Sequence, residues 1–130
     1  MTNAPDGLYY TKEHEWVQVD GDTATVGITD HAQELLTDIV FVELPDVGNI
    51  LEQGKPACVV ESVKSVSDVY APIGGEVSEV NSELENAPEL INNDAFGEGW
   101  IFKLSSCSMG DLDALMDAQA YQEFVANEPH

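Results

Sequence analysis

The apolar segments of this chain are short, which limits the folds that it can adopt. Its longest unbroken apolar runs, residues 39–42 and 57–60, have four residues each, whereas a membrane-spanning helix needs about twenty. The runs are rich in β-branched residues and alternate with Gly, Pro, Asp and Asn, a pattern typical of short strands joined by turns. The 130 residues contain no internal linker, so we expect one domain over residues 1–130.

Seven segments have the composition of strands. Asp20-Gly21-Asp22 is a hairpin turn signal, and Pro45 ends a strand that could not continue through it. In the last segment, Trp100, Phe102 and Leu104 alternate onto one expected face. The expected strands are residues 16–19, 23–29, 38–44, 58–63, 67–71, 76–80 and 100–104. The pattern predicts a mainly β fold, a sandwich or flattened barrel of two sheets with short helices added.

Two helices are expected. Asp30 is a candidate cap for a short helix, with Gln33 at the third helical position as in a capping box. A longer helix is predicted over residues 111–126, with Asp111 as its N-cap and apolar residues at roughly helical spacing. We expect this second helix to be amphipathic and to close over a sheet.

Charge excludes two classes of partner. The chain has 25 Asp and Glu against 4 Lys and no Arg, and its net charge is −21. Phosphate contacts need Lys and Arg, so neither nucleic acid nor an anionic membrane is an expected partner. The acidity indicates either partners that are basic at the contact or an adaptation for solubility in a saline or cold habitat. The N-terminal residues lack the pattern of a signal or transit peptide, which predicts a cytoplasmic location.

Motifs of catalysis or metal binding are not found in the sequence. Gly48 and Gly54-Lys55 have the wrong spacing for a phosphate loop. His14, His31 and His130 are too far apart in sequence for a local metal motif. Cys58 and Cys107 are isolated, and we expect both to be buried thiols. The chain is therefore expected to have no catalytic residues and no metal.

One of the four lysines has an unusual setting. Lys64 is the centre of residues 61–68, with small serines around it and apolar strand segments on both sides. This pattern predicts a hairpin with the lysine at its tip. Glu61 and Asp68 lie at offsets −3 and +4 from the lysine, and Gly48 and Gly75 at −16 and +11. From these residues alone, a modifiable lysine and an ordinary solubilising turn residue both remain open.

Several motifs together resemble the glycine cleavage system H protein family, a family of lipoyl carriers. The resemblance extends in order from about Gly7 to Phe124 and includes Gly99-Trp100 and Tyr121. The strongest motif is VESVKSVSDVYAPIGGEV at residues 60–77. The others are HEWV at residues 14–17, VGITDHAQ at 26–33, and VFVELP at 40–45 followed by Gly48. The lysine segment alone would also fit other lipoyl domains.

The resemblance implies a non-catalytic, monomeric carrier with a flattened β-barrel, its lipoyl-binding region over about residues 23–105. It implies lipoic acid as the cofactor, joined by an amide to Lys64. It also implies three partner enzymes: glycine decarboxylase (P protein), aminomethyltransferase (T protein) and dihydrolipoamide dehydrogenase (L protein). A lipoate ligase or a lipoyl/octanoyl transferase would attach the group, with Glu61, Asp68, Gly48 and Gly75 as determinants of recognition or of hairpin shape.

The resemblance also implies a cleft in which the loaded arm folds back. Glu15 matches the family's acidic residue near that cleft, where it could hold an amine by a charge-assisted hydrogen bond. An ordinary surface carboxylate is the alternative. Some family members have a histidine where this chain has Leu35, so no arm contact is carried over there. His31 is expected to organise its helix rather than to touch the arm.

Three other functions are considered. An H-like protein that relays lipoyl groups would use the same scaffold. A biotin carrier is disfavoured, because biotinyl domains usually have Met on both sides of the lysine, and here the neighbours are Val63 and Ser65. An unmodified acidic binding module would tolerate Lys64→Arg. A lipoyl carrier would not, because a guanidinium is not acylated by this chemistry.

Overall fold

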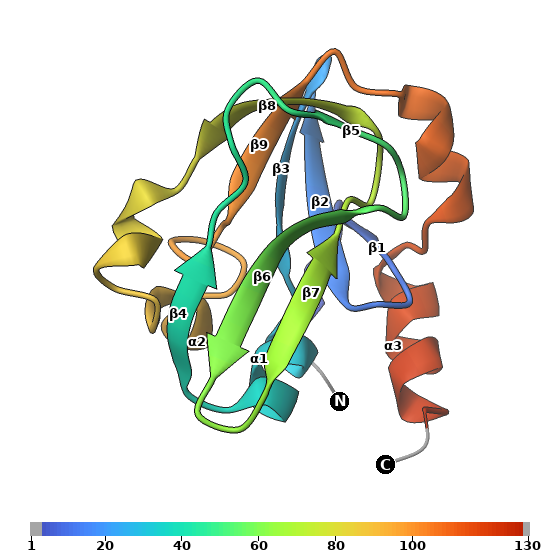
Figure 1. The fold of residues 1–130 in the computed structure, drawn as a ribbon. Coiled ribbons are helices and arrows are strands. Elements are labelled where there is room, and N and C mark those ends of the chain that lie inside the picture. Colours follow the sequence, from blue (N-terminus) through green and yellow to red (C-terminus); the bar gives the residue numbers. More distant parts are fainter. Residues whose placement is uncertain (1–3, 129–130) are drawn as a thin grey trace.

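The fold is a flattened sandwich of two antiparallel sheets that do not close into a barrel (Figure 1). The computed structural model describes residues 4–128. Six strands form one sheet, in the spatial order β1 (Tyr9–Tyr10), β2 (Glu15–Asp20), β3 (Thr23–Ile28), β9 (Phe102–Ser105), β8 (Gly75–Val80) and β5 (Ile50–Leu51). The second sheet has three strands, in the order β4 (Ile39–Glu43), β6 (Pro56–Ser62) and β7 (Val66–Tyr70). The predicted fold class is confirmed.

Short helices cover the ends and one side of the sandwich (Figure 1). They are α1 (Asp30–Leu36), the 3₁₀ helix η1 (Ser82–Glu85), α2 (Leu90–Asn93), the 3₁₀ helix η2 (Met109–Ala114) and α3 (Ala118–Ala126). Within residues 4–128, none of these helices has the length and apolar character that a membrane-spanning helix needs. The two-residue strands β1 and β5 were not predicted, because two residues carry no alternation pattern.

The main core lies between the two sheets. Val26, Phe102 and Leu104 of the six-stranded sheet and Val42 and Val60 of the three-stranded sheet are almost fully buried in it. The alternation along each strand sends these side chains to one face, and their removal from water is the main drive for the two sheets to associate. Cys58 is buried in this core, as predicted, whereas Cys107 is only half-buried; both are free thiols.

A second, smaller core lies between α3 and strands β1 and β2. Tyr10 and Tyr121 stack with ring centroids 4.7 Å apart, and Trp16 donates a hydrogen bond from Nε1 to the carbonyl oxygen of Ala95 at 3.0 Å. A Cβ on Gly27 would lie 2.7 Å from the Trp16 ring, so the close approach of ring and strand requires glycine. Trp100 also packs here, which corrects the prediction that it shares one strand face with Phe102 and Leu104.

The caps and bounds of the predicted helices differ from expectation. Thr29, not Asp30, caps α1: its hydroxyl accepts a hydrogen bond from Ala32 N at 3.2 Å. The single helix expected over residues 111–126 is divided into η2 and α3. The division has a tertiary cause, because Met116 leaves the helix to form two backbone hydrogen bonds with Tyr10, at 2.8 and 2.9 Å. Asp117 then caps α3 through Ala120 N.

Candidate functional site

Lys64 lies at the tip of the β6–β7 hairpin, as predicted. The strands pair in antiparallel register up to Glu61 and Val66. The turn is closed by a hydrogen bond from Ser62 N to Ser65 O at 2.8 Å. The Ser62 hydroxyl accepts further hydrogen bonds from Lys64 N at 3.3 Å and Ser65 N at 3.1 Å. The small serines thus fix the turn through the backbone and leave the lysine side chain exposed.

The hairpin tip rests against the C-terminal end of α1. Lys64 Nζ donates a hydrogen bond to the carbonyl oxygen of Leu35 at 3.0 Å, and Val63 N donates one to Asp38 O at 3.1 Å. A cation is favourable at the end of a helix, where the last carbonyl groups lack partners. Within residues 4–128, no carboxylate forms an ion pair with Lys64. The amine is therefore held only by its hydrogen bond to the Leu35 carbonyl oxygen, which can break without separating an ion pair.

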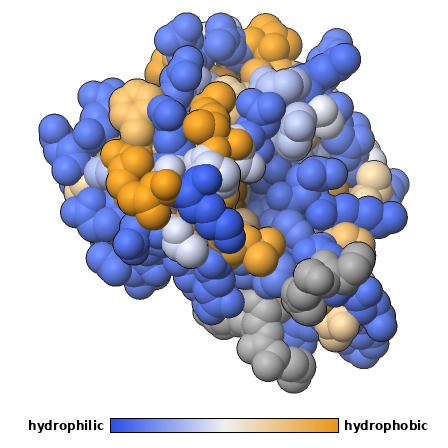
Figure 2. All heavy atoms as spheres, turned by 60° about the horizontal axis from the view of Figure 1, so that its bottom comes forward, coloured by the Kyte–Doolittle hydropathy of each residue, from blue (hydrophilic) through white to orange (hydrophobic). Residues whose placement is uncertain are grey.

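An exposed apolar patch surrounds the hairpin. Figure 2 looks onto this end of the molecule and shows apolar side chains gathered among hydrophilic ones. This apolar patch consists of residues from α1, β4 and the hairpin: Leu35, Val40, Phe41, Val63 and Val66. Their exposed fractions range from 44% to 69%. Large apolar side chains gathered on so acidic a surface indicate a contact site for another protein.

A cleft of about 110 Å³ opens between α1 and β7. Its walls are mainly apolar, and Leu35, whose carbonyl holds the Lys64 amine, is one of the residues that line it. Three carboxylates also line the cleft, those of Glu13, Glu15 and Asp68. The apolar lining residues are Ile28, Ala32, Leu35, Leu36, Val60 and Val69. The cleft therefore suits an apolar chain that carries a positive charge.

Glu15 is buried, with only 2% of its surface exposed. Its carboxylate accepts hydrogen bonds from the Thr11 hydroxyl at 2.6 Å and from Tyr70 N at 3.1 Å. Burial is the main cause that raises the pKa of Glu15 to about 7, against the lowering effect of these two bonds. The alternative that Glu15 is an ordinary surface carboxylate is wrong. Glu15 also lines a second pocket, of about 330 Å³, between Tyr70 and η2.

The other predicted site residues are placed in two separate regions. Glu61 and Asp68 lie on the hairpin strands that carry Lys64, and Asp68 is exposed beside the cleft. Gly75 begins β8 of the six-stranded sheet, and Gly48 lies in the turn before β5 of the same sheet, with both strands away from the hairpin tip (Figure 1). Gly48 has a φ of +98°, and a Cβ on Gly75 would lie 3.0 Å from Ser105 O. The positive φ at Gly48 and the close backbone contact at Gly75 each favour glycine for a local reason. The part of both glycines in recognition stays a prediction.

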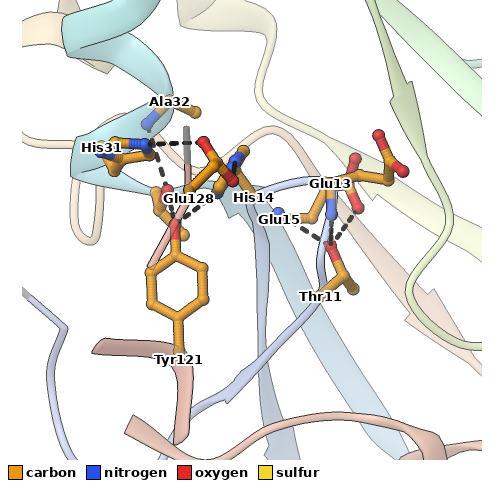
Figure 3. A network of polar contacts seen from close by, with 9 residues as sticks. Thr11, Glu13, His14, Glu15, His31, Ala32, Tyr121 and Glu128 are labelled. Atoms are coloured by element: carbon orange, nitrogen blue, oxygen red, sulfur yellow. Dashed lines mark hydrogen bonds and ion pairs between the residues drawn. The ribbon is translucent and has the colours of Figure 1, made fainter. Parts of the chain in front are cut away.

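A polar cluster beside the cleft was not predicted. Figure 3 shows His14, His31 and Glu128 meeting above the Tyr121 ring. Glu128 Oε2 lies 3.0 Å from His14 Nε2, and Glu128 Oε1 lies 3.4 Å from His31 Nε2. The Tyr121 hydroxyl lies 2.8 Å from His14 Nδ1 and 2.7 Å from the Thr29 hydroxyl. No local spacing could have revealed this cluster, since His14 contacts Tyr121 and Glu128, which lie near the other end of the chain.

The two histidines of the cluster differ in their surroundings. Burial lowers the pKa of His14, although Glu128 opposes this effect. His14 also has a φ of +71°, a left-handed backbone conformation that is uncommon for a side chain of this size. His31 contacts Glu128 and the His14 ring but does not line the cleft, and its expected role in organising α1 stays a prediction. His130 lies outside the described residues.

Comparisons with known proteins give one consistent result. A sequence model of the family described as glycine cleavage H-protein matches residues 8–128. The glycine cleavage system H protein of Thermus thermophilus is 56% identical over 124 residues, which cover 95% of this chain and 97% of that protein. The protein of the same name from Alteromonas mediterranea is 52% identical over 129 residues, covering 98% and 100%.

A solved structure agrees with these sequence matches. The crystal structure of a glycine cleavage system H protein from Mycobacterium marinum superposes with a TM-score of 0.85 at 36% identity. The match covers 94% of this chain and 98% of that one. The shared architecture therefore extends over both sheets and the terminal helix.

Proposed function

The chain belongs to the glycine cleavage H-protein family, and from this premise we propose that it is the lipoyl carrier of a glycine cleavage system. Lys64 is the attachment residue, through an amide with lipoic acid. The loaded chain takes the aminomethyl group of glycine from a pyridoxal-phosphate decarboxylase to a tetrahydrofolate-dependent aminomethyltransferase. Dihydrolipoamide dehydrogenase then reoxidises it. The chain acts in this cycle as a carrier and not as a catalyst.

The observation that carries this proposal is the position of the Lys64 amine. It lies at an exposed hairpin tip and contacts Leu35, a residue that also lines the apolar cleft. An acyl group on Nζ would therefore start beside the cleft and still be free to extend away from the protein. The lysine stem is long and flexible, and its amine can be acylated.

The residues around Lys64 fit a lipoyl group. When bound, this group supplies a dithiolane that opens to two thiols, one of which carries the one-carbon unit. The apolar walls of the cleft match its hydrocarbon chain. Acylation removes the positive charge of Lys64, so the hydrogen bond to Leu35 O loses its charge assistance and the hairpin tip is released from α1 more readily.

In this proposal Glu15 holds the amine of a loaded arm. Its carboxylate lines the cleft, and burial makes the ionised form costly without a cationic partner. A primary ammonium in the cleft would stabilise that ionised form and donate a charge-assisted hydrogen bond to the Glu15 carboxylate. Glu13 and Asp68 add negative charge around the same opening. This arrangement would keep a reactive amine away from water between partner enzymes.

The surface around Lys64 supports docking to the enzymes of the cycle. The apolar patch supplies the apolar contact area, and the net charge of −21 favours partners with a basic rim. Tethering also raises the local concentration of the cargo at each site. Glu61 and Asp68 lie on the hairpin that an attaching enzyme, a lipoate ligase or a lipoyl/octanoyl transferase, must approach.

Intact mass followed by peptide mapping tests the proposal. The chain is expressed in a lipoate-replete host, and the expected result is one lipoyl increment on Lys64. Lys12, Lys55 and Lys103 serve as internal controls and should remain unmodified. A biotin increment would assign the chain to another class of carrier. No increment after incubation with a lipoate ligase would overturn the proposal.

A further inference from the structure

The cluster beside the cleft presents three side chains, two imidazoles and one carboxylate, of the types that bind transition metals. Ligand atoms of His14, His31 and Glu128 all lie within 4.8 Å of one another. Around a tetrahedral zinc ion, with bonds of about 2.0–2.1 Å, neighbouring ligand atoms lie about 3.3 Å apart. The two separations between the carboxylate and the imidazoles are 3.0 and 3.4 Å. A cation could thus be enclosed with small movements of the side chains.

We propose that His14, His31 and Glu128 bind one divalent transition-metal cation, represented by Zn²⁺. Two imidazoles and one carboxylate suit zinc and its neighbours, whereas Ca²⁺ and Mg²⁺ take oxygen ligands. The site has three protein ligands, and a tetrahedral ion would take its fourth ligand from water. The site does not use Lys64 or its modification, although His14 also lines the cleft assigned to the arm.

The surroundings of His14 fix the atom that would bind. Its Nδ1 faces the Tyr121 hydroxyl at 2.8 Å, and that hydroxyl is held in turn by Thr29 at 2.7 Å. With Nδ1 engaged in this way, Nε2 is left to face Glu128 and the cation (Figure 3). Metal-bound histidines generally have their other ring nitrogen hydrogen-bonded, which fixes the orientation of the ring. The left-handed backbone of His14 aims the side chain at the same point.

The site is accessible, and its ligands come from distant elements. The side chains of His14, His31 and Glu128 are 13%, 9% and 22% exposed, so a cation can enter without unfolding. His14 precedes β2, His31 lies in the first turn of α1, and Glu128 follows α3. A bound cation would therefore fasten the end of α3 to the sheet and to α1, and it would stabilise the folded chain by mass action.

Zinc titration of the tag-free, metal-stripped chain tests the site. Isothermal titration calorimetry in excess Mg²⁺ should give one site per chain. His31→Gln and Glu128→Gln should each weaken zinc binding about tenfold or more, since even outer-shell changes cost that much. Glu123→Gln is the matched control, because Glu123 is an exposed carboxylate of α3 away from the cluster. Equal affinity in Glu128→Gln and Glu123→Gln would overturn the proposal.

Nuclear magnetic resonance of the unmutated chain provides a second test, which holds even if a variant fails to fold. One equivalent of Zn²⁺ should shift the imidazole nitrogen signals of both His14 and His31. If neither signal moves, or if both move only together with carboxylates across the whole surface, the proposal is wrong. The thermal midpoint should rise with zinc in the unmutated chain and in Glu123→Gln, but not in Glu128→Gln.

Discussion

The Lys64 hairpin and the region around Glu15 and His14 are built in opposite ways. The hairpin turn is closed by bonds between residues three or fewer positions apart, with further bonds to Leu35 and Asp38, and its lysine is exposed. Glu15 and His14 are held by partners 55 and 107 residues away, and Glu15 is buried. A contiguous segment can thus present a reactive group to solvent. A buried carboxylate with a shifted pKa requires elements that only the fold brings together.

The largest expected effect comes from Lys64→Arg, which should abolish lipoylation and carrier turnover completely. The fold should be unaffected, because an exposed turn side chain contributes little to stability. Intact mass would report lipoylation, an assay with the three partner enzymes would report turnover, and the thermal midpoint would report stability. Only the first two should change. Lys103→Arg is the matched control and should keep full activity. Retained turnover in Lys64→Arg would place the function away from the hairpin.

Glu15→Gln should change how stability depends on pH. The folded pKa of about 7 lies above the usual 4.5, so the folded chain holds this proton more tightly than the unfolded chain. The contribution of Glu15 to the free energy of unfolding therefore falls as pH rises from about 4.5 to 7. Above pH 7 this contribution should stay low. The total decrease in the free energy of unfolding is up to about 3 kcal/mol.

Denaturant unfolding at several pH values measures this effect. The difference in unfolding free energy between Glu15→Gln and the unmutated chain should shift in favour of the variant across that range. Glu123→Gln, which changes an exposed carboxylate on α3, is the control and should show no such trend. If the difference in unfolding free energy does not change with pH, burial does not raise the pKa of Glu15.

Tyr121→Phe should have a smaller effect, about 1–2 kcal/mol of lost stability. The variant keeps the stack on Tyr10 but removes the hydroxyl that contacts His14 Nδ1 and Thr29. Urea unfolding would measure the loss, and the extent of lipoylation should not change. Tyr9→Phe is a suitable control, since the Tyr9 hydroxyl forms no hydrogen bond to residues 4–128. Equal stability of the two variants would contradict a structural role of this hydroxyl.

The smallest effect on stability is expected at the apolar patch. The double substitution Val63→Ser with Val66→Ser should change the unfolding free energy by less than about 0.5 kcal/mol. It should nevertheless raise the KM of the decarboxylase for the carrier severalfold, because it removes contact area beside Lys64. Val47→Ser is the matched control, as Val47 is 62% exposed but lies outside the patch. An equal KM in both variants would place the contact surface elsewhere.

Much of the fold could be predicted because its signals are local. The alternation along β2, β3 and β6 and the turn residues around Lys64 all lie within short windows of sequence. The errors arose where tertiary contacts override local preference. Residues 111–126 have helical spacing, but Met116 is drawn out of the helix by its pairing with Tyr10. Trp100 alternates with Phe102, yet it packs into the second core.

The sheet-forming pattern, the lysine at a hairpin tip and the family motifs can be read from neighbouring residues. The burial of Glu15 beside an apolar cleft, the contact of the Lys64 amine with Leu35 at that cleft, and the meeting of His14, His31 and Glu128 depend on the fold. The physical reason is that burial, and with it the pKa of Glu15, depends on which distant segments exclude water from a site.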